Sequence, residues 1–281
     1  MSKGPYYTAL DHAMTFRRLV KPIVPPVLWS IGRELRQRLV VSADRLAFAP
    51  LGWDTPLPPG GGNEAFWSRF VERERAWCQA LIARVRAEHP VLASDDATLG
   101  YLAFGYVVLL TARHKDKITI IDYGGNLGEY YWIGKALVPG VELEFHCKEL
   151  PAIAAAGRLV SPDVRWHTDD ECLDEPYDLV MFSGSLPYLR DWKAVLRRAA
   201  LGTRQYLFLA DIPSVRDVPT YVITQRSGGV TNLGYLFNRS EIADTLQSSG
   251  LRLLREFTMG PHAPVANAPE QPVYAGWLFA R

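Results

Sequence analysis

The sequence predicts an α/β protein with a doubly wound, mostly parallel sheet of seven strands, closed by an antiparallel C-terminal strand and preceded by a helical N-terminal segment. From residue 118 onward, short β-branched or apolar runs alternate with helix-like stretches. A glycine-rich turn directly follows the first run, and the last two runs have no helix between them. Alternation over this length is typical of a parallel sheet with helices on both faces. A chain of 281 residues can also bury a large core.

The predicted elements follow from the hydrophobic periodicity, in chain order. Five strands are expected at Ile118–Asp122, Glu142–Cys147, Val164–His167, Asp178–Phe182 and Gln205–Ala210, with helices at Glu129–Leu137, Pro151–Leu159 and Trp192–Ala200. Asn238 followed by Glu241 has the spacing of a capping box and predicts a helix that runs to Gly250. The strands Leu251–Phe257 and Val273–Phe279 should then pair antiparallel, because no crossover helix separates them.

The first 95 residues differ from the rest, and we expect residues 1–95 to form a helical segment beside a catalytic domain that spans 96–281. Basic and apolar residues are interspersed in residues 1–50, where Pro22, Pro25 and Pro26 break the pattern into two short helical pieces. This segment is either a lid packed on the main domain or a basic amphipathic element on an anionic membrane or a protein partner. A Pro/Gly-rich loop is predicted at 50–63, and helices are predicted at Glu64–His89 and Asp95–Thr111.

Composition excludes several classes of function. The formal net charge of +1 gives no basic field for nucleic acid, so a small-molecule substrate is expected. No uninterrupted apolar run reaches the ~18 residues that span a bilayer, and the N-terminus lacks the ordered regions of a signal peptide. Cys78, Cys147 and Cys172 are widely spaced and form no zinc-type motif. We therefore expect no metal site and a location in the reducing cytoplasm.

The most informative segment is the turn after the first strand, which reads Asp122-Tyr123-Gly124-Gly125-Asn126-Leu127-Gly128. Its glycines lack the Gly-x-Gly-x-x-Gly spacing of a dinucleotide-binding loop. They fit the pattern acid-x-Gly-x-Gly-x-Gly of loops that bind S-adenosylmethionine (SAM), except that Asn126 stands at the middle glycine. Asparagine tolerates left-handed backbone better than most residues. A carboxylate at Asp122 would repel a pyrophosphate but suits a cationic ligand, which predicts SAM as the cofactor and S-adenosylhomocysteine (SAH) as the product.

Further acids follow the ends of the next two strands. Glu149, beside Leu150, lies 21 residues after Gly128. A carboxylate about 20 residues past such a glycine turn is where a ribose diol is held. Asp169 and Asp170 follow the third strand, where a carboxylate can accept a hydrogen bond from the adenine amine. The alternative for each of these acids is a solvated loop residue.

A second turn of small residues, Ser183-Gly184-Ser185, ends the fourth strand. Ligands of open α/β sheets bind beyond the carboxyl ends of the strands, near the switch in strand order. We therefore expect Ser183 near the cofactor and Tyr188 near the substrate. The turn lacks the second glycine of a Gly-x-Ser-x-Gly nucleophile elbow, which argues against a serine hydrolase.

Three segments together resemble a bacterial family of SAM-dependent methyltransferases that is often associated with polysaccharide or secondary-metabolite gene clusters. They are residues 182–191 (Phe-Ser-Gly-Ser-Leu-Pro-Tyr-Leu-Arg-Asp), residues 122–128 and residues 148–151 (Lys-Glu-Leu-Pro). The segments Ile-Val-Pro-Pro-Val-Leu and Leu-Gly-Trp-Asp extend the resemblance over most of the chain, although Pro187 replaces the glutamine usual in that family. The resemblance implies a class I methyltransferase (Rossmann-like) fold and SAM as the cofactor, and it implies little about the methyl acceptor.

Methyl transfer to a hydroxyl needs an aligned acceptor and a base. Strand and loop ends supply Asp211, His167 and His262 as candidate bases. Of these, His262 is preferred because the loop before the last strand can reach over the pocket. His146, inside a strand, is expected in the core or on the surface. Because other methyltransferase motifs are missing, we expect O-methylation of a small molecule or sugar. Residues 216–237 should cap the acceptor or contact a second copy of the chain in a homodimer.

Two alternatives remain open at this point. The first is a cyclase or scaffold protein that binds SAM without transferring its methyl group, since its binding residues would be the same. The second is an NAD(P)-dependent oxidoreductase, which shares the alternating pattern of strands and helices. The glycine spacing and the acid at Asp122 count against the second.

Overall fold

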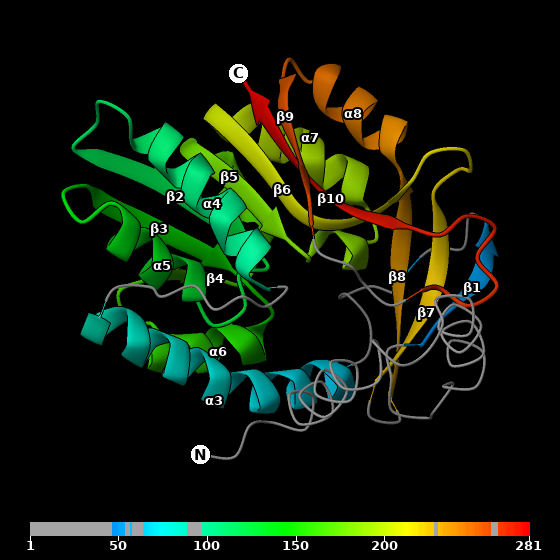
Figure 1. Ribbon diagram of the computed structural model, residues 1–281, viewed down its shortest axis with the longest axis horizontal. Helices are drawn as coiled ribbons and strands as arrows, with labels where there is room; N and C mark the ends of the chain where they lie inside the picture. The colour runs from blue at the N-terminus through cyan, green and yellow to red at the C-terminus, as the bar shows by residue number, and fades with distance from the viewer. Residues whose placement is uncertain (1–46, 54–56, 58–63, 89–96, 228–229, 260–263) are drawn as a thin grey trace, which may run out of the picture. The chain divides into compact units, whose positions relative to one another are not determined.

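The computed structural model describes residues 47–53, 57, 64–88, 97–227, 230–259 and 264–281 (Figure 1). The two helical pieces predicted in the N-terminal segment fall almost entirely within residues 1–46 and lie outside the described residues, as does His262. Two other predicted helices match the structure closely: α3 covers Glu64–Glu88 and α4 covers Ala97–Ala112.

The central sheet has the predicted architecture. Across the described residues its seven strands stand in the order β9-β10-β6-β5-β2-β3-β4. Their bounds are Lys117–Tyr123 (β2), Glu142–Lys148 (β3), Arg165–His167 (β4), Tyr177–Ser183 (β5), Thr203–Val215 (β6), Arg252–Thr258 (β9) and Val273–Ala280 (β10). Strands β2 to β6 pair in parallel, whereas β10 is antiparallel to both β6 and β9. The antiparallel C-terminal strand is therefore confirmed.

Helices cover both faces of this sheet (Figure 1). One hydrophobic core joins β2 to α3, α4, α5 (Glu129–Leu137) and α6 (Pro151–Val160). The other joins the sheet to α7 (Trp192–Gly202), α8 (Arg239–Gln247) and the short helix η1 (Asp170–Asp174). Strand β2 supplies Ile118 and Ile120 to the first core and Ile121 to the second. A strand buried on both sides needs apolar residues on both sides, which is why β2 reads as a continuous β-branched run.

A second, antiparallel group of strands extends the sheet beyond the end of β6. Strand β8 (Val230–Asn238) pairs with β6 in parallel at Ser214 and Val215, and antiparallel with β7 (Tyr221–Ser227). Strand β1 (Ala47–Trp53) pairs antiparallel with β7. The prediction of a loop from residue 50 was therefore wrong for Pro50–Trp53. Proline is tolerated there because β1 lies at the sheet edge and its register shifts between Pro50 and Gly52.

The start of α8 forms half of the predicted capping box. The Asn238 side chain accepts hydrogen bonds from the backbone N–H of Ser240 (2.9 Å) and Glu241 (3.4 Å). The Glu241 carboxylate does not return to Asn238; it accepts instead from the Thr220 N–H (3.1 Å) and Lys193 Nζ (2.8 Å). It thereby fastens α8 to the neighbouring elements. The helix ends at Gln247, three residues before the predicted stop at Gly250.

Within the described parts of the chain, none of the helices combines the length and apolar character needed to cross a membrane. Cys78, Cys147 and Cys172 are buried and form no disulfide.

Candidate active site

The turn between β2 and α5 has three residues in left-handed backbone conformation: Gly124 (φ 80°), Asn126 (φ 51°) and Gly128 (φ 83°). Asparagine is one of the few residues other than glycine that adopts this conformation at low cost. The replacement of the middle glycine of the pattern by Asn126 therefore preserves the turn, as predicted.

Neighbouring side chains give a further reason for glycine at two points of the turn, Gly124 and Gly125. A Cβ atom on Gly125 would lie 2.5 Å from Asp122 Oδ2 and 2.7 Å from Cys147 Sγ. A Cβ atom on Gly124 would lie 2.2 Å from the Cβ of Ser185, in the turn after β5. The glycines thus let the turn pack directly on the ends of β2, β3 and β5.

Three buried carboxyl groups surround this turn, and we call Asp122, Glu129 and Glu149 the acid cluster. Their exposed fractions are 0%, 8% and 8%. Neither oxygen of Asp122 has a hydrogen-bond partner, and Glu129 Oε2 has none. Glu149 is better satisfied, because Oε1 accepts from the Asn126 N–H (3.0 Å) and Oε2 from the Leu150 N–H (2.8 Å). Buried polar atoms without partners are rare in native proteins and call for an explanation.

The environment of the acid cluster disfavours negative charge. Burial, followed by the charges of Glu129 and Glu149, raises the pKa of Asp122 well above its usual range. Burial raises the pKa of Glu129 and of Glu149 to about 7. The cluster therefore carries an electrostatic cost that a cation bound beside it would relieve. Sequence reasoning missed Glu129. The available signal was its position three residues after Asn126, whose Nδ2 lies 3.5 Å from Glu129 Oε1.

Asp169 and Asp170, the two acids predicted beside the adenine, both have partners inside the protein. Asp170 Oδ1 accepts from the Tyr123 hydroxyl (2.5 Å) and lies 3.3 Å from Lys148 Nζ. Lys148 Nζ in turn stands 4.4 Å from the centre of the Tyr123 ring. The Asp169 side chain accepts from the Glu171 N–H (3.1 Å) and caps η1. The structure thus ties Asp170 to Tyr123, the residue that follows Asp122.

The turn after β5 lies against the glycine turn, as predicted for two strand ends at the same edge. Ser185 Oγ donates a hydrogen bond to the Tyr123 carbonyl oxygen. Ser183 Oγ lies 3.0 Å from the hydroxyl of Tyr130, on the first turn of α5. Gly184 has φ 68°, and its N–H donates to the Ala210 carbonyl oxygen at the end of β6 (3.0 Å). Strands β2, β5 and β6 therefore bring their functional ends together.

Asp211 has left-handed backbone (φ 58°), which is uncommon for a residue other than glycine inside a strand. The pairing of β6 with β10 shifts register beside it, between Ala275 and Trp277. A Cβ atom on Gly184 would lie 3.7 Å from Asp211 Oδ2. The predicted base is thus next to the β5 turn. Backbone strain of this kind concentrates at functional sites.

The charge of Asp211 acts on three tyrosines. Burial, with a smaller contribution from Asp211, raises the pKa of Tyr188 to about 12. Burial is also the largest cause of the raised pKa of Tyr130 and Tyr274; the charges of Asp122, Glu129 and Asp211 add to it for Tyr130, and those of Tyr188 and Asp211 add to it for Tyr274. The Tyr188 hydroxyl donates to Gln225 Oε1 on β7 (2.7 Å). The Tyr188 ring meets the Trp67 ring of α3 edge-on, with 5.0 Å between centroids. Helix α3 and the β7–β8 hairpin therefore both reach Tyr188, which lies in the short helix η2 (Leu186–Tyr188).

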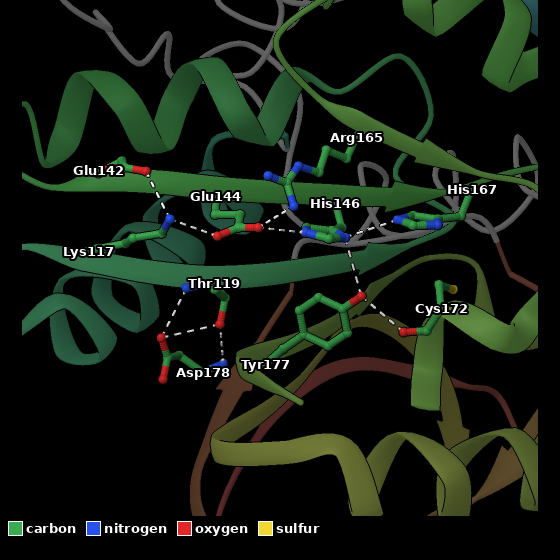
Figure 2. A network of polar contacts seen from close by, with 10 residues as sticks. All are labelled: Lys117, Thr119, Glu142, Glu144, His146, Arg165, His167, Cys172, Tyr177 and Asp178. Carbon is green, nitrogen blue, oxygen red and sulfur yellow. Dashed lines mark hydrogen bonds and ion pairs between the residues drawn. The ribbon is translucent and has the colours of Figure 1, made fainter. Parts of the chain in front are cut away.

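Of the histidine candidates, His167 lies in a different group of side chains, and His262 falls outside the described residues. His167 stacks on His146, with 5.1 Å between ring centroids and 2.9 Å between His167 Nε2 and His146 Nδ1 (Figure 2). The Tyr177 hydroxyl is 3.3 Å from the same His146 nitrogen. His146 is buried, which is the first of the two positions expected for it. Among the residues that the structure describes, no group of three or more His, Cys, Asp and Glu side chains is arranged to hold a metal ion.

No protein-family model matches the chain, and no curated protein matches it. Solved structures are similar to it. One is 1,6-didemethyltoxoflavin-N1-methyltransferase of Burkholderia thailandensis with bound 1,6-didemethyltoxoflavin and SAH. Its TM-score is 0.50 at 15% identity, over 86% of this chain and 97% of that one. Another is magnesium protoporphyrin IX methyltransferase of Synechocystis PCC 6803 with bound SAH. Its TM-score is 0.48 at 12% identity, over 76% of this chain and 98% of that one.

At these identities the similarity concerns the fold. Together with the strand order and the antiparallel β10, it establishes the class I methyltransferase (Rossmann-like) fold for this chain.

Proposed function

We propose that this protein is a SAM-dependent methyltransferase that transfers the methyl group to a hydroxyl of a small-molecule or sugar acceptor. The observation that carries the proposal is the acid cluster, which presents buried, unpartnered carboxylate oxygens at the glycine turn of a class I methyltransferase fold. SAM carries two cationic groups, a sulfonium and an ammonium. Among the described residues, the unpartnered oxygens of the acid cluster have no cationic partner. The methyltransferases with the same fold act on acceptors as different as a toxoflavin precursor and a porphyrin.

The residues at the strand ends divide among the parts of this cofactor. Asp122 and the turn Gly124–Gly128 face its methionine end, and Glu149 holds the ribose hydroxyls. Asp169 or Asp170 borders the adenine, and the turn Ser183–Ser185 closes the remaining side. Glu149 suits a diol because a carboxylate accepts several hydrogen bonds, and only two of its sites are used by the Asn126 and Leu150 N–H groups.

When bound, the cofactor supplies a methyl group on a positively charged sulfur. A nucleophilic oxygen that attacks the methyl carbon displaces this sulfur, which leaves as part of SAH. The protein aligns the acceptor and removes its proton. Asp211 accepts that proton, because its carboxylate stands beside the β5 turn and among the hydroxyls of Tyr130, Tyr188 and Tyr274. Tyr188, held by Gln225 and packed on Trp67, positions the acceptor. The hairpin β7–β8 is the acceptor cap.

Calorimetric titration of the full chain with SAM, SAH and NAD tests the cofactor assignment. We expect SAM and SAH to bind and NAD not to bind. Binding of NAD, with failure of both SAM and SAH, overturns the proposal. Replacing Glu149 with alanine should weaken SAM binding by ~1–3 kcal/mol, because hydrogen bonds to a charged group are lost. Unchanged affinity in a folded Glu149→Ala protein removes that residue from the site.

The reaction itself is tested with methyl-labelled SAM and a panel of phenols, sugars and amines. We expect label in hydroxyl acceptors only. For an accepted hydroxyl, Asp211→Asn should lower turnover by ~10²–10⁴-fold, the usual contribution of a general base, and should leave SAM affinity unchanged. Full turnover in the Asp211→Asn protein assigns the base elsewhere. Label found in amines overturns the assignment of O-methylation.

A further inference from the structure

We infer that Glu129 is a specificity-determining residue that makes the site prefer the sulfonium cofactor SAM over its uncharged thioether product SAH. The inference rests on the proposed function. It adds to the identity of the cofactor a preference for its charged form, SAM. Such a preference would favour replacement of the spent cofactor by fresh SAM after each turnover.

The placement of Glu129 is the first argument. It is the first residue of α5, directly after the left-handed Gly128, and only 8% of it is exposed. The backbone N–H of Glu129 and, at 3.5 Å, Asn126 Nδ2 act on its carboxylate, whereas Oε2 has no hydrogen-bond partner. Both oxygens of the neighbouring Asp122 are also without a partner. The two side chains therefore place uncompensated carboxylate oxygens at one buried location.

The absence of a protein counter-charge is the second argument. In the part of the chain that the structure describes, no ion pair joins Asp122, Glu129 or Glu149 to a lysine or arginine. Of these three acids, Lys148 acts only on Glu149, and it is the smallest of the influences on the pKa of that residue. On the other side, α3 brings Glu74 close enough for its charge to act on Glu129. Among the described residues, the charges that act on Glu129 are therefore those of other acids.

The difference between the two ligands is the third argument. SAM and SAH have nearly the same shape and share the ammonium, the ribose and the adenine. They differ by one methyl group and one positive charge, both at sulfur. A unit charge inside a protein interacts far more strongly with nearby carboxylates than it would in water. The acid cluster must therefore distinguish the two ligands by their charge. Of its three members, Glu129 is the one that has no role in the proposed ribose contact or in the glycine-turn pattern.

Proton release should accompany this preference. Glu129 and Glu149 have pKa values of about 7, so each is partly protonated at neutral pH. The titratable groups that interact with Glu129 are Asp122 from β2, Cys147 from β3, Glu149 after β3, Glu74 and Cys78 from α3, and Tyr130 from α5, and none of these carries positive charge. A bound sulfonium favours the ionised carboxylates, so SAM should expel more protons than SAH and should gain affinity relative to SAH as pH rises.

The decisive experiment measures the dissociation constants of SAM and SAH for the wild-type chain, Glu129→Gln and Glu129→Asp. Glu142→Gln serves as the matched control, because Glu142 is an exposed glutamate on β3. We expect Glu129→Gln to lower the ratio Kd(SAH)/Kd(SAM) about tenfold, the effect of about 1.4 kcal/mol, mainly through weaker SAM binding. Glu129→Asp and Glu142→Gln should keep the wild-type ratio. An equal change for both ligands in Glu129→Gln, or no change, overturns the inference.

A measurement on the wild-type chain covers the case in which the glutamine variant does not fold. The ratio Kd(SAH)/Kd(SAM) should rise between pH 6 and pH 8, since the shared ammonium cancels from the ratio. A constant ratio over this range overturns the inference but leaves the proposed function intact. Failure of the wild-type chain to bind either ligand would instead overturn the proposed function.

Discussion

The central sheet carries two groups of carboxylates that have opposite surroundings. The acid cluster lies at the carboxyl ends of β2 and β3 and has oxygens without partners. The second group spreads across β2, β3, β4 and β5, and we call it the paired network (Figure 2). Its residues are Lys117, Thr119, Glu142, Glu144, His146, Arg165, His167, Tyr177 and Asp178.

Every carboxylate of the paired network has partners. Glu144 pairs with Lys117 (2.8 Å), with Arg165 and with His146 (3.5 Å), and the Lys117 hydrogen bond leads the effects that lower its pKa. Asp178 lies on β5 and is buried. Burial by itself would raise its pKa, but bonds from Lys115 and Thr119 lower it overall. Asp122 is buried to a similar degree, and its pKa shifts the opposite way.

The comparison separates structural carboxylates from ligand-binding ones. A buried carboxylate with protein partners stabilises the fold, and its removal leaves those partners unsatisfied. A buried carboxylate without partners destabilises the empty fold and is explained by a ligand that arrives later. Four predictions test this distinction.

The largest effect is expected for Asp178→Ala. Asp178 accepts from Lys115 Nζ (2.8 Å), from the N–H (2.9 Å) and Oγ1 (3.3 Å) of Thr119, and from Gln205 Nε2 (3.2 Å). Its loss should lower the free energy of unfolding by about 2–4 kcal/mol, because four donors lose their acceptor. Urea denaturation followed by circular dichroism measures this change. A loss below about 1 kcal/mol would remove the distinction between the two groups.

The second prediction has the opposite sign. Asp122→Asn should raise the free energy of unfolding at pH 8 by about 1–2 kcal/mol, because a buried carboxyl group without hydrogen-bond partners is replaced by a neutral amide. The same change should weaken SAM binding at least tenfold. Denaturation and calorimetry on one preparation give both values. A destabilised Asp122→Asn protein that keeps its SAM affinity would show that Asp122 is structural.

The third prediction concerns pH. Glu129 and Glu149 have folded-state pKa values of about 7, above the usual 4.5. The unfolded chain therefore releases protons that the folded chain keeps, and their contribution to stability falls as pH rises from about 4.5 to 7. Burial lowers the pKa of His146 and His167 below 6.5. The unfolded chain then binds more protons, so the histidine contribution falls as pH drops below about 6.5.

Thermal unfolding of two variants separates the glutamate contribution to the pH dependence of stability from the histidine contribution. Glu129→Gln should match the wild-type midpoint at pH 5 and exceed it at pH 7.5. The unfolding midpoint of His167→Gln should lie furthest below the wild-type midpoint at pH 7.5 and less far below it at pH 5, because the substitution removes a group that is costly only in acid. Parallel pH profiles for both variants and the wild type would contradict the assignment of the two slopes.

The smallest effect is expected for Glu142→Gln. The Glu142 side chain is 68% exposed and lies 3.0 Å from Lys117 Nζ, which keeps its second partner Glu144. Exposed ion pairs are screened by water and salt and contribute little. The unfolding midpoint should not change measurably, at low or high salt. A clear loss of stability would mean that the paired network acts as one unit.

Local pattern was sufficient for most of the fold. The β-branched run of β2 and the apolar periodicity of α5 follow from residues that are neighbours in the chain, and the predicted bounds of α5 are the observed ones. Strands β1, β7 and β8 were not predicted, because Pro50 and Gly234 weaken the strand signal of β1 and β8, and β1 pairs with β7, which lies far along the chain. Strands β7 and β8 are consecutive and pair with each other, but the pairing of β1 with β7 is contained in no local window.

The sequence by itself determined the order of the seven strands of the central sheet and of their helices, the left-handed turn with Asn126 in place of glycine, and the gathering of acids at the carboxyl ends of the strands. Only the tertiary structure decided which acids are satisfied. Asp178 meets donors from residues 115, 119 and 205, whereas Asp122 meets none and Glu129 Oε2 meets none. The physical reason is that burial and secondary structure are largely set by local pattern, whereas the partner of a buried charge comes from another element of the fold.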